Sequence, residues 1–217
     1  MITLTAFRWV PDFAQGLVKD LRVRWALEEA GMAYREKLIG PEDQGSAGYR
    51  ALQPFGQVPV IETGALKLFE SGSIVLHIAE QSDVLMPTDP AGRARTRTWV
   101  FAALNSIEPS VDNLGDTEGE DAWAVARRPA AMERVQRRLS DLETWLGEKD
   151  YLEGRFTAGD LMMTTVLRNL RQTDTIANRP RLAAYVARCQ ARPAFGKALA
   201  DHMRPFEVNA PRVTELT

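Results

Sequence analysis

Two short segments in the first half of the chain carry residue types that suit the binding of a small peptide. The segment Gln53-Pro54-Phe55-Gly56-Gln57-Val58-Pro59-Val60 places a proline at the start of an apolar run, and Glu70-Ser71 follows further along. Proline removes a donor from a strand ladder, so the plain interpretation of Pro59 is the start or edge of a strand. A cis Val58-Pro59 bond would instead turn the backbone groups of Val58 outward, free to pair with an extended peptide.

The elements that must position these segments alternate between strand and helix. Strands are predicted by period-two alternation and by short apolar runs, and helices by apolar residues three and four apart. The predicted strands are Ile2–Phe7, Tyr34–Ile39, Val58–Glu62 and Leu66–Phe69, and the predicted helices are Leu17–Ala30 and one that Ser71 can cap. The order is therefore β-α-β followed by β-β-α.

The pattern changes after Gln81, because the segment 82–92 holds Pro87 and Pro90 and everything beyond it reads as helix. We expect an α+β domain at residues 1–81, a linker at 82–92 and an all-α domain at 93–217. The residues 116–121 are expected to form a polar loop between helices. The end of the chain, with Pro205 and Pro211, is expected to form a tail over the surface.

The composition is that of an ordinary globular protein. The 217 residues include 27 Lys or Arg and 29 Asp or Glu, for a net charge of -2, and 45% are hydrophobic. The lack of a basic excess argues against nucleic acid as the main partner. No apolar stretch approaches membrane-spanning length and no signal peptide precedes the first strand, so we expect a cytoplasmic protein without a membrane partner.

The single cysteine, Cys189, excludes an internal disulfide and a C-x-x-C redox motif. It lies on an apolar helical stripe, so the simplest interpretation is a small core residue. His77 and His202 have no metal partner at ligand spacing, and no metal is expected. Thr157 and Asp160 have the spacing of a helix capping box, which indicates a role in folding.

The motifs taken together resemble the cytosolic-type bacterial glutathione S-transferase family. The resemblance lies in Pro54-x-Gly56-x-Val58-Pro59, in Glu70-Ser71, and in the segment 22–29 of the first helix. It continues in the second half, from Tyr151-Leu152-x-Gly154 to Thr157-x-x-Asp160 and from Pro180 to Phe195. It implies a thioredoxin-like N-terminal domain (βαβββα), an all-helical C-terminal domain and a homodimer.

The resemblance also implies a glutathione site formed by Gln57, Val58, Pro59, Glu70 and Ser71. The backbone of Val58 would pair with the cysteinyl residue of the tripeptide. Ser71 and the N–H groups at the helix start would take the γ-glutamyl carboxylate, since the helix dipole favours negative charge there. Glu70 would pair with the α-ammonium group.

The group that activates the thiol is an open question within this resemblance. A free cysteine thiol has a pKa near ~8.5, so a donor or a positive potential must favour its thiolate at neutral pH. Many family members use Tyr, Ser or Cys near the end of the first strand. The segment from Arg8 to Asp20 contains none of these, nor Thr or His.

Gln15 is the predicted catalytic residue, because its amide N–H can donate to a thiolate. Backbone N–H groups at the start of the following helix are an equal rival. Arg8 and Lys19 offer positive potential, although surface charge is the simpler interpretation of both. Asp12 and Asp20 would repel a thiolate, so we expect them to face solvent or cap the helix.

The electrophile is expected to lie against Trp9, Phe13, Asn105, Glu108 and Val111, although Trp9 is equally explained by packing between domains. The implied reaction is conjugation of glutathione to an apolar electrophile by substitution or addition. A glutathione-dependent isomerase or peroxidase, and a catalytically silent glutathione-binding or adaptor protein, stay open as alternatives.

Overall fold

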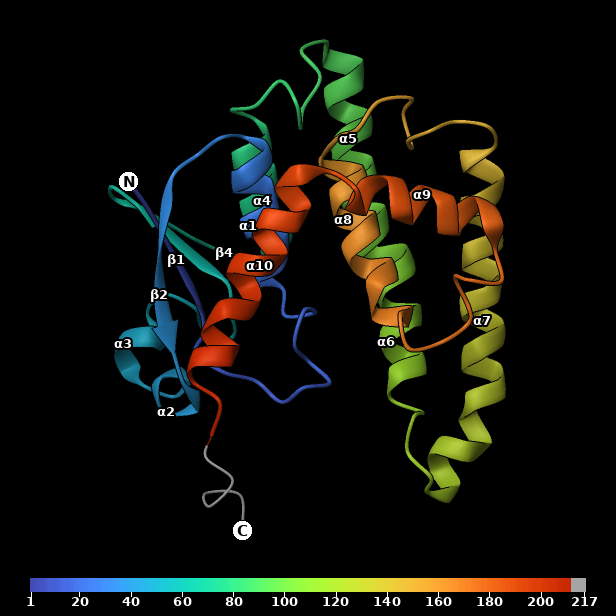
Figure 1. The fold of residues 1–217 in the computed structure, drawn as a ribbon, viewed down its shortest axis with the longest axis horizontal. Helices are drawn as coiled ribbons and strands as arrows, with labels where there is room; N and C mark the ends of the chain where they lie inside the picture. The colour runs from blue at the N-terminus through green and yellow to red at the C-terminus, as the bar shows by residue number, and fades with distance from the viewer. Residues whose placement is uncertain (212–217) are drawn as a thin grey trace. The chain divides into compact units, whose positions relative to one another are not determined.

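The computed structural model describes residues 1–211, which divide into two compact units (Figure 1). The first unit combines Met1–Ser82 with the segment from Pro193 onward, and the second is Asp83–Arg192. The units differ from the expected domains in two respects. The segment from Pro193 groups with the N-terminal part, and residues 83–92 of the expected linker belong to the second unit, whose first helix begins at Pro90. The domain boundaries at residues 81 and 93 remain a prediction.

The first unit is built on a four-stranded sheet of order β2-β1-β3-β4. The strands are β1 (Ile2–Phe7), β2 (Tyr34–Ile39), β3 (Val60–Thr63) and β4 (Leu66–Phe69). β1 pairs in parallel with β2, and β3 pairs antiparallel with both β1 and β4. The sheet confirms the predicted thioredoxin-like order, and β3 begins two residues later than predicted because Val58 and Pro59 lie outside its ladder.

Three longer helices and two short ones complete this unit. The longer ones are α1 (Asp20–Glu29), α4 (Ser71–Ala79) and α10 (Pro193–Val208), and the short ones are α2 (Pro41–Gln44) and α3 (Ala47–Arg50). Eight of the ten residues of α1 are buried, because α4 and α10 both pack on it. The rings of Trp25 and Phe195 meet edge to face at 4.8 Å. α1 therefore forms the centre of the unit's helical layer.

The predicted tail is wrong for the residues up to Val208, because α10 extends through Pro205. Pro205 and Phe206 are buried on the same helix as His202. Burial of the apolar face of the last two turns stabilises the helix. This stabilisation outweighs the loss of the one backbone hydrogen bond for which Pro205 has no N–H. Pro211 lies beyond the helix, and residues 212–217 lie outside the described part.

A buried polar cluster joins α1 to α10. One carboxylate oxygen of Asp20 accepts from Arg24 Nε at 2.8 Å and lies 3.0 Å from His202 Nδ1, and Arg24 also pairs with Glu36 of β2. Burial alone would raise the pKa of Asp20, but His202 and Arg24 together hold it below its ordinary value. The expectation that Asp20 faces solvent is therefore wrong, since its charge is matched inside the unit.

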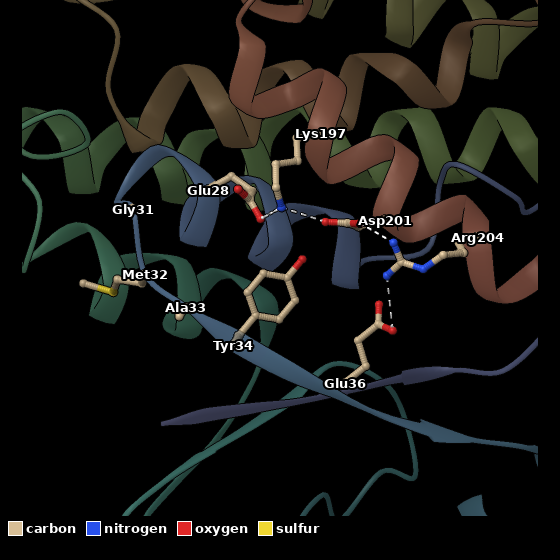
Figure 2. Close-up of a pocket in the computed structure, with 9 residues that line it drawn as sticks. All are labelled: Glu28, Gly31, Met32, Ala33, Tyr34, Glu36, Lys197, Asp201 and Arg204. Carbon is tan, nitrogen blue, oxygen red and sulfur yellow. Dashed lines mark hydrogen bonds and ion pairs between the residues drawn. The ribbon is translucent and has the colours of Figure 1, made fainter.

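A shallow hollow of about 480 Å³ lies beside this cluster, between α1, β2 and α10 (Figure 2). Lys197 donates to Glu28 at 2.6 Å and to Asp201 at 2.9 Å. Arg204 donates to Asp201 at 2.6 Å and lies 3.7 Å from Glu36. The charges that line the hollow pair with one another, so we interpret it as the edge of a helix–sheet contact.

The regular secondary structure of the second unit is entirely helical. They are α5 (Pro90–Ala102), α6 (Glu108–Gly115), α7 (Ala122–Leu146), α8 (Ala158–Leu167) and α9 (Pro180–Gln190), with a π-helical segment Ala103–Ile107 and a 3₁₀ turn Arg168–Leu170. Every residue of α8 is buried, and α5, α6 and α9 contact it. The loop predicted at 116–121 joins α6 to α7. The second unit is the expected all-helical one.

The predicted capping box of α8 is confirmed. Asp160 accepts the backbone N–H of Thr157 at 3.0 Å and that of Leu152 at 2.9 Å, and the Tyr185 hydroxyl donates to it at 3.1 Å. Burial raises the pKa of Asp160. Cys189 is buried in the same unit, where desolvation raises the pKa of its thiol to about 12, which confirms it as a core residue.

None of the helices within residues 1–211 has both the length and the apolar character that a membrane crossing requires.

Candidate functional site

The loop from Gln53 to Val58, which leads into β3, is held in place by α2 and α3. Three side chains of these helices donate to carbonyl oxygens of the loop. They are Tyr49 Oη to Gln57 O at 2.6 Å, Gln44 Nε2 to Gly56 O at 2.8 Å, and Arg50 Nη1 to Pro54 O at 2.7 Å. Gly56 has φ +66, a conformation that glycine adopts without strain. The short helices therefore act as a clamp that shapes the loop.

The peptide bond between Val58 and Pro59 is cis. The sheet register begins at Val60, so the backbone of Val58 lies outside the strand ladder, at the end of the clamped loop. An extended ligand can add to a strand edge at such a position. Pairing of Val58 with a ligand stays a prediction.

The start of α4 differs from the expected cap. Glu70, and not Ser71, is the N-cap residue, and it has φ 68 with ψ 112. Within residues 1–211, Glu70 is the non-glycine residue with a positive φ. Such a conformation costs on the order of 1 kcal/mol and is enriched at functional sites. Ser71 is the first helical residue and is 5% exposed, so the interpretation of Ser71 as a simple cap is wrong.

Arg22 is a functional candidate that sequence reasoning did not single out. Its guanidinium Nη1 donates to Ser71 Oγ at 3.2 Å, and the residue is 3% exposed. A buried cation therefore lies at the helix start, where backbone N–H groups also favour an anion. The arginine stands in the quoted first-helix motif, but no spacing rule connects position 22 with position 71. Only the packing of α1 on α4 reveals the pair.

A cavity of about 400 Å³ opens between the end of β1, the start of α1 and the clamped loop. Its walls are mostly apolar, and they include two predicted glutathione-binding residues and one predicted electrophile-site residue. The lining residues are Phe7, Phe13, Ala14, Leu17, Val18, Lys19, Gln44, Gln57 and Val58. Lys19 is the charged residue in this set. The volume suits part of a small ligand.

Gln15 lies outside this set and uses its amide within its own loop. The Nε2 atom donates to Val10 O at 3.1 Å and to Asp12 Oδ1 at 3.0 Å. An amide nitrogen carries two hydrogens, so both are engaged. The arrangement does not favour Gln15 as a donor to a thiolate, although its catalytic role stays a prediction.

The residues predicted to contact the electrophile lie in different parts of the structure. Trp9 and Phe13 line a second cavity of about 550 Å³ in the first unit, together with Gln15 and the end of α10. In the second unit, Asn105 is exposed on the π-helical segment, while Glu108 and Val111 are buried on α6. Within residues 1–211, no three His, Cys, Asp or Glu side chains gather closely enough to hold a metal ion.

Two family models match the chain. The model described as glutathione S-transferase, N-terminal domain, matches residues 15–80. The model described as glutathione S-transferase, C-terminal domain, matches residues 109–202. The two matches cover the clamped loop, the start of α4 and most of the helical unit.

Proteins whose sequences are similar to this chain include a glutathione S-transferase and an isomerase. A glutathione S-transferase of Arabidopsis thaliana is 35% identical over 164 residues, which are 68% of this chain and 65% of that protein. A maleylacetoacetate isomerase of Rhizobium meliloti is 32% identical over 200 residues, which are 85% of this chain and 92% of that protein. The chain thus spans somewhat less than two thirds of the plant protein and nearly all of the bacterial one.

A solved structure with the same fold holds a ligand. It is a glutathione transferase from Burkholderia graminis with two glutathione molecules bound per subunit. It superposes with a TM-score of 0.78 at 25% identity, and the match covers 91% of this chain and 87% of that chain.

Proposed function

Because the chain belongs to the glutathione S-transferase family, we propose that it joins the thiol of glutathione to an apolar electrophilic small molecule. The observation that supports this most directly is the start of α4. Arg22 and Ser71 offer positive potential and a hydroxyl there, and the N-cap residue Glu70, which directly precedes Ser71, carries a carboxylate. The γ-glutamyl end of glutathione carries both an ammonium and a carboxylate, so it needs both signs side by side.

In the proposed complex, the two described features bind the two ends of one tripeptide. Ser71, Arg22 and the α4 backbone N–H groups take the γ-glutamyl carboxylate, and Glu70 takes the ammonium. The backbone of Val58 pairs with the cysteinyl residue, with Gln57 and Pro59 on either side. The cysteinyl sulfur then lies by the apolar cavity that Val58 lines.

The proposed reaction is attack of the thiolate on the electrophile. The sulfur electron pair forms the new S–C bond, and the displaced group leaves with the electrons of the broken bond. In an addition, the electrons of the attacked π bond move onto the acceptor, which then takes a proton from water. Trp9 and Phe13 are proposed to contact the electrophile, and Asn105, Glu108 and Val111 are proposed to contribute from the helical unit.

A second candidate is a glutathione-dependent isomerase. The relative from Rhizobium meliloti, which is named maleylacetoacetate isomerase, is the specific observation in its favour. In that case the thiolate adds to a double bond and leaves again after rotation, so no conjugate accumulates. A peroxidase, or a silent glutathione-binding adaptor, shares the binding of glutathione with both candidates and differs from them in the later steps.

We propose a homodimer in a bacterial cytoplasm, with small molecules as partners and without nucleic acid or membrane partners. Light scattering during size-exclusion chromatography measures the oligomeric state directly. A mass of about one chain, 24.2 kDa, would contradict the dimer.

The test of the function combines binding with chemistry. Calorimetric titration with glutathione should give a one-site isotherm, and an ultraviolet thiolate scan of the complex should give a bound thiol with a pKa below that of free glutathione. Incubation with aromatic halides and unsaturated carbonyl compounds should then give conjugates by mass spectrometry. Absence of glutathione binding would contradict every enzymatic interpretation. Binding without a lowered thiol pKa would favour the silent adaptor, and turnover of a cis double bond without conjugate would favour the isomerase.

A further inference from the structure

We infer that Tyr49 is a positioning residue that sets the direction in which the backbone N–H of Val58 meets the cysteinyl residue of glutathione. This inference rests on the proposed function and adds a residue to it. The Tyr49 hydroxyl donates to Gln57 O at 2.6 Å. Tyr49 lies on α3, is 5% exposed and does not belong to the wall of the cavity that Gln57 and Val58 line. It therefore acts on the ligand through the peptide unit between Gln57 and Val58.

The planarity of this peptide unit transmits the contact. The bond between Gln57 and Val58 is trans, and the C=O and N–H groups of a planar trans peptide point in opposite directions. Because Gln57 O accepts from the Tyr49 hydroxyl, the N–H of Val58 points away from Tyr49. A rotation of the plane would turn both groups together. The hydrogen bond that holds the carbonyl oxygen therefore also holds the N–H.

The N–H of Val58 is available to a ligand. Within residues 1–211 it has no hydrogen-bond partner, and the strand register begins only at Val60. Val58 is 8% exposed, and a backbone donor that is largely buried without a partner is unfavourable. Gln57 and Val58 both line the cavity of about 400 Å³. A carbonyl oxygen of a ligand in that cavity, such as the cysteinyl carbonyl of glutathione, supplies the missing acceptor.

The surroundings of Tyr49 fix the position of its hydroxyl. The ring belongs to a buried cluster with Ile39, Val58 and Val60. Its backbone is held as well, because Ser46 Oγ accepts the N–H of Tyr49 at 3.2 Å. Desolvation raises the pKa of Tyr49 to about 12, so the hydroxyl keeps its proton and stays a donor at neutral pH. A rigid donor therefore faces Gln57 O before any ligand binds.

The other two hydrogen bonds of the clamp act on different peptide units. Gln44 donates to Gly56 O and Arg50 donates to Pro54 O. Neither of these carbonyl groups belongs to the unit that carries the N–H of Val58. A role in placing that N–H therefore predicts a larger effect for Tyr49 than for Arg50, whereas general stiffening of the loop predicts similar effects.

The decisive variant is Tyr49→Phe, which keeps the buried ring and removes only the hydroxyl. In the free variant the peptide unit between Gln57 and Val58 can rotate more easily, so glutathione must order it on binding. The dissociation constant of glutathione should rise about threefold to tenfold, the range that corresponds to one ordinary hydrogen bond. Isothermal titration calorimetry measures it, and circular dichroism checks the fold.

Amide hydrogen exchange, followed by NMR at saturating glutathione, shows whether the effect reaches the N–H of Val58. In wild type, glutathione should slow exchange of the Val58 amide, because the ligand gives it an acceptor. In Tyr49→Phe the bound Val58 amide should exchange about threefold to tenfold faster than in the wild-type complex. The amides of Gly72 and Ser73, at the start of α4, should be protected equally in both proteins. A general loss of stability would instead speed the exchange of all three amides.

Two matched variants make the inference refutable. Tyr151→Phe removes a hydroxyl in the second unit and keeps the ring that packs edge to face on Phe156. Arg50→Met removes the clamp hydrogen bond to Pro54 O. Both should bind glutathione within about twofold of wild type. Equal losses of affinity in Arg50→Met and Tyr49→Phe would overturn the inference in favour of general stiffening of the loop.

The proposed function fails in a distinguishable way. If wild-type protein does not bind glutathione, the function itself is contradicted before any variant is made. If wild type binds glutathione without protecting the Val58 amide, the anchor at Val58 is wrong and the inference falls with it. If wild type protects that amide and Tyr49→Phe matches it in affinity and in protection, only the role of Tyr49 is wrong.

Discussion

Ser71 and Arg22 form the most informative pair at the residue scale. Each residue alone has an ordinary explanation, a helix start for Ser71 and a surface charge for Arg22. Their contact at 3.2 Å, with both side chains buried, places a cation and a hydroxyl on the first turn of α4. Glu70 adds a strained backbone at the same turn. Three unusual features at one turn indicate a binding site better than any of them alone.

Replacement of Ser71 by alanine should weaken glutathione binding. The variant removes a hydrogen bond to a charged carboxylate, which contributes about 1.5 to 3 kcal/mol. Isothermal titration calorimetry of Ser71→Ala measures the loss, and circular dichroism checks the fold. Ser73→Ala is the matched control, since Ser73 is exposed on the same turn. Equal affinities for the two variants would remove Ser71 from the site.

Cys189 should be unreactive in the folded protein. Its side chain is buried and desolvation raises the pKa of its thiol to about 12, so almost no thiolate forms at neutral pH. A chromogenic disulfide reagent should label no thiol in native protein and one thiol per chain in concentrated urea. Free glutathione, run alongside, controls for the reagent. Fast labelling of the native protein would contradict the assignment of Cys189 to the core.

At the element scale, the packing of α10 on α1 is the main contact that sequence patterns did not predict. α10 follows the helical unit in the chain, yet its apolar face, including Phe195 and Phe206, is buried in the first unit. Lys197 and Arg204 add ion pairs to α1 and β2 at the exposed edge (Figure 2). Because α1 begins just after Lys19 and carries Arg22, this packing also supports the candidate site.

Phe195→Ala should destabilise the protein through α10. Loss of a buried aromatic ring against Trp25 costs about 3 to 5 kcal/mol. Urea unfolding monitored by tryptophan fluorescence gives the free energy of unfolding. Val208→Ala, at an exposed position of the same helix, should change it by less than about 0.5 kcal/mol. Similar losses in both variants would mean that α10 is not held by this ring.

At the scale of the whole molecule, the cluster of Asp20, Arg24 and His202 couples stability to acid. The pKa of Asp20 is lowered in the folded state, against burial that acts in the opposite direction. The ionised carboxylate therefore contributes stability above its ordinary pKa of 3.8, and this contribution is lost as the pH falls through the lower, folded value. Breaking such a buried pair costs about 3 to 5 kcal/mol near neutral pH.

Asp20→Asn should accordingly be less stable than wild type by a constant amount above about pH 5. The difference should shrink below pH 3.8, where the carboxyl first binds a proton in the unfolded chain, and should be lost below the lower pKa of the folded state. Urea unfolding at a series of pH values measures it. Asp141→Asn is the control, since Asp141 is exposed on α7, where its carboxylate lies 3.8 Å from Arg138. A difference that stays constant down to the lowest pH would show that folding does not lower the pKa of Asp20.

The sequence predicted the elements well because their signals are local. The strands at 2–7, 34–39 and 66–69 match the structure residue by residue, and the capping box at Thr157 comes from a spacing of three. The helix predicted from Leu17 begins at Asp20, because residues 11–18 form consecutive turns that a period cannot separate from helix. The burial of charged residues is not predictable in the same way, as Asp20 illustrates. A charged residue is expected to be exposed unless the partners that neutralise it are known, and those partners are distant in the sequence.

The sequence by itself determined the family resemblance, the order of strands and helices, and the short motifs around Val58 and Ser71, since all of these depend on neighbours along the chain. Tertiary structure decided which distant residues share a site. It joined Arg22 to Ser71, turned Asp20 toward His202 and engaged Gln15 within its loop. The physical reason is that hydrogen bonds and charge pairs act over a few ångströms of space, and only the packing of α1 against α4, α10 and the clamped loop brings those groups within that range.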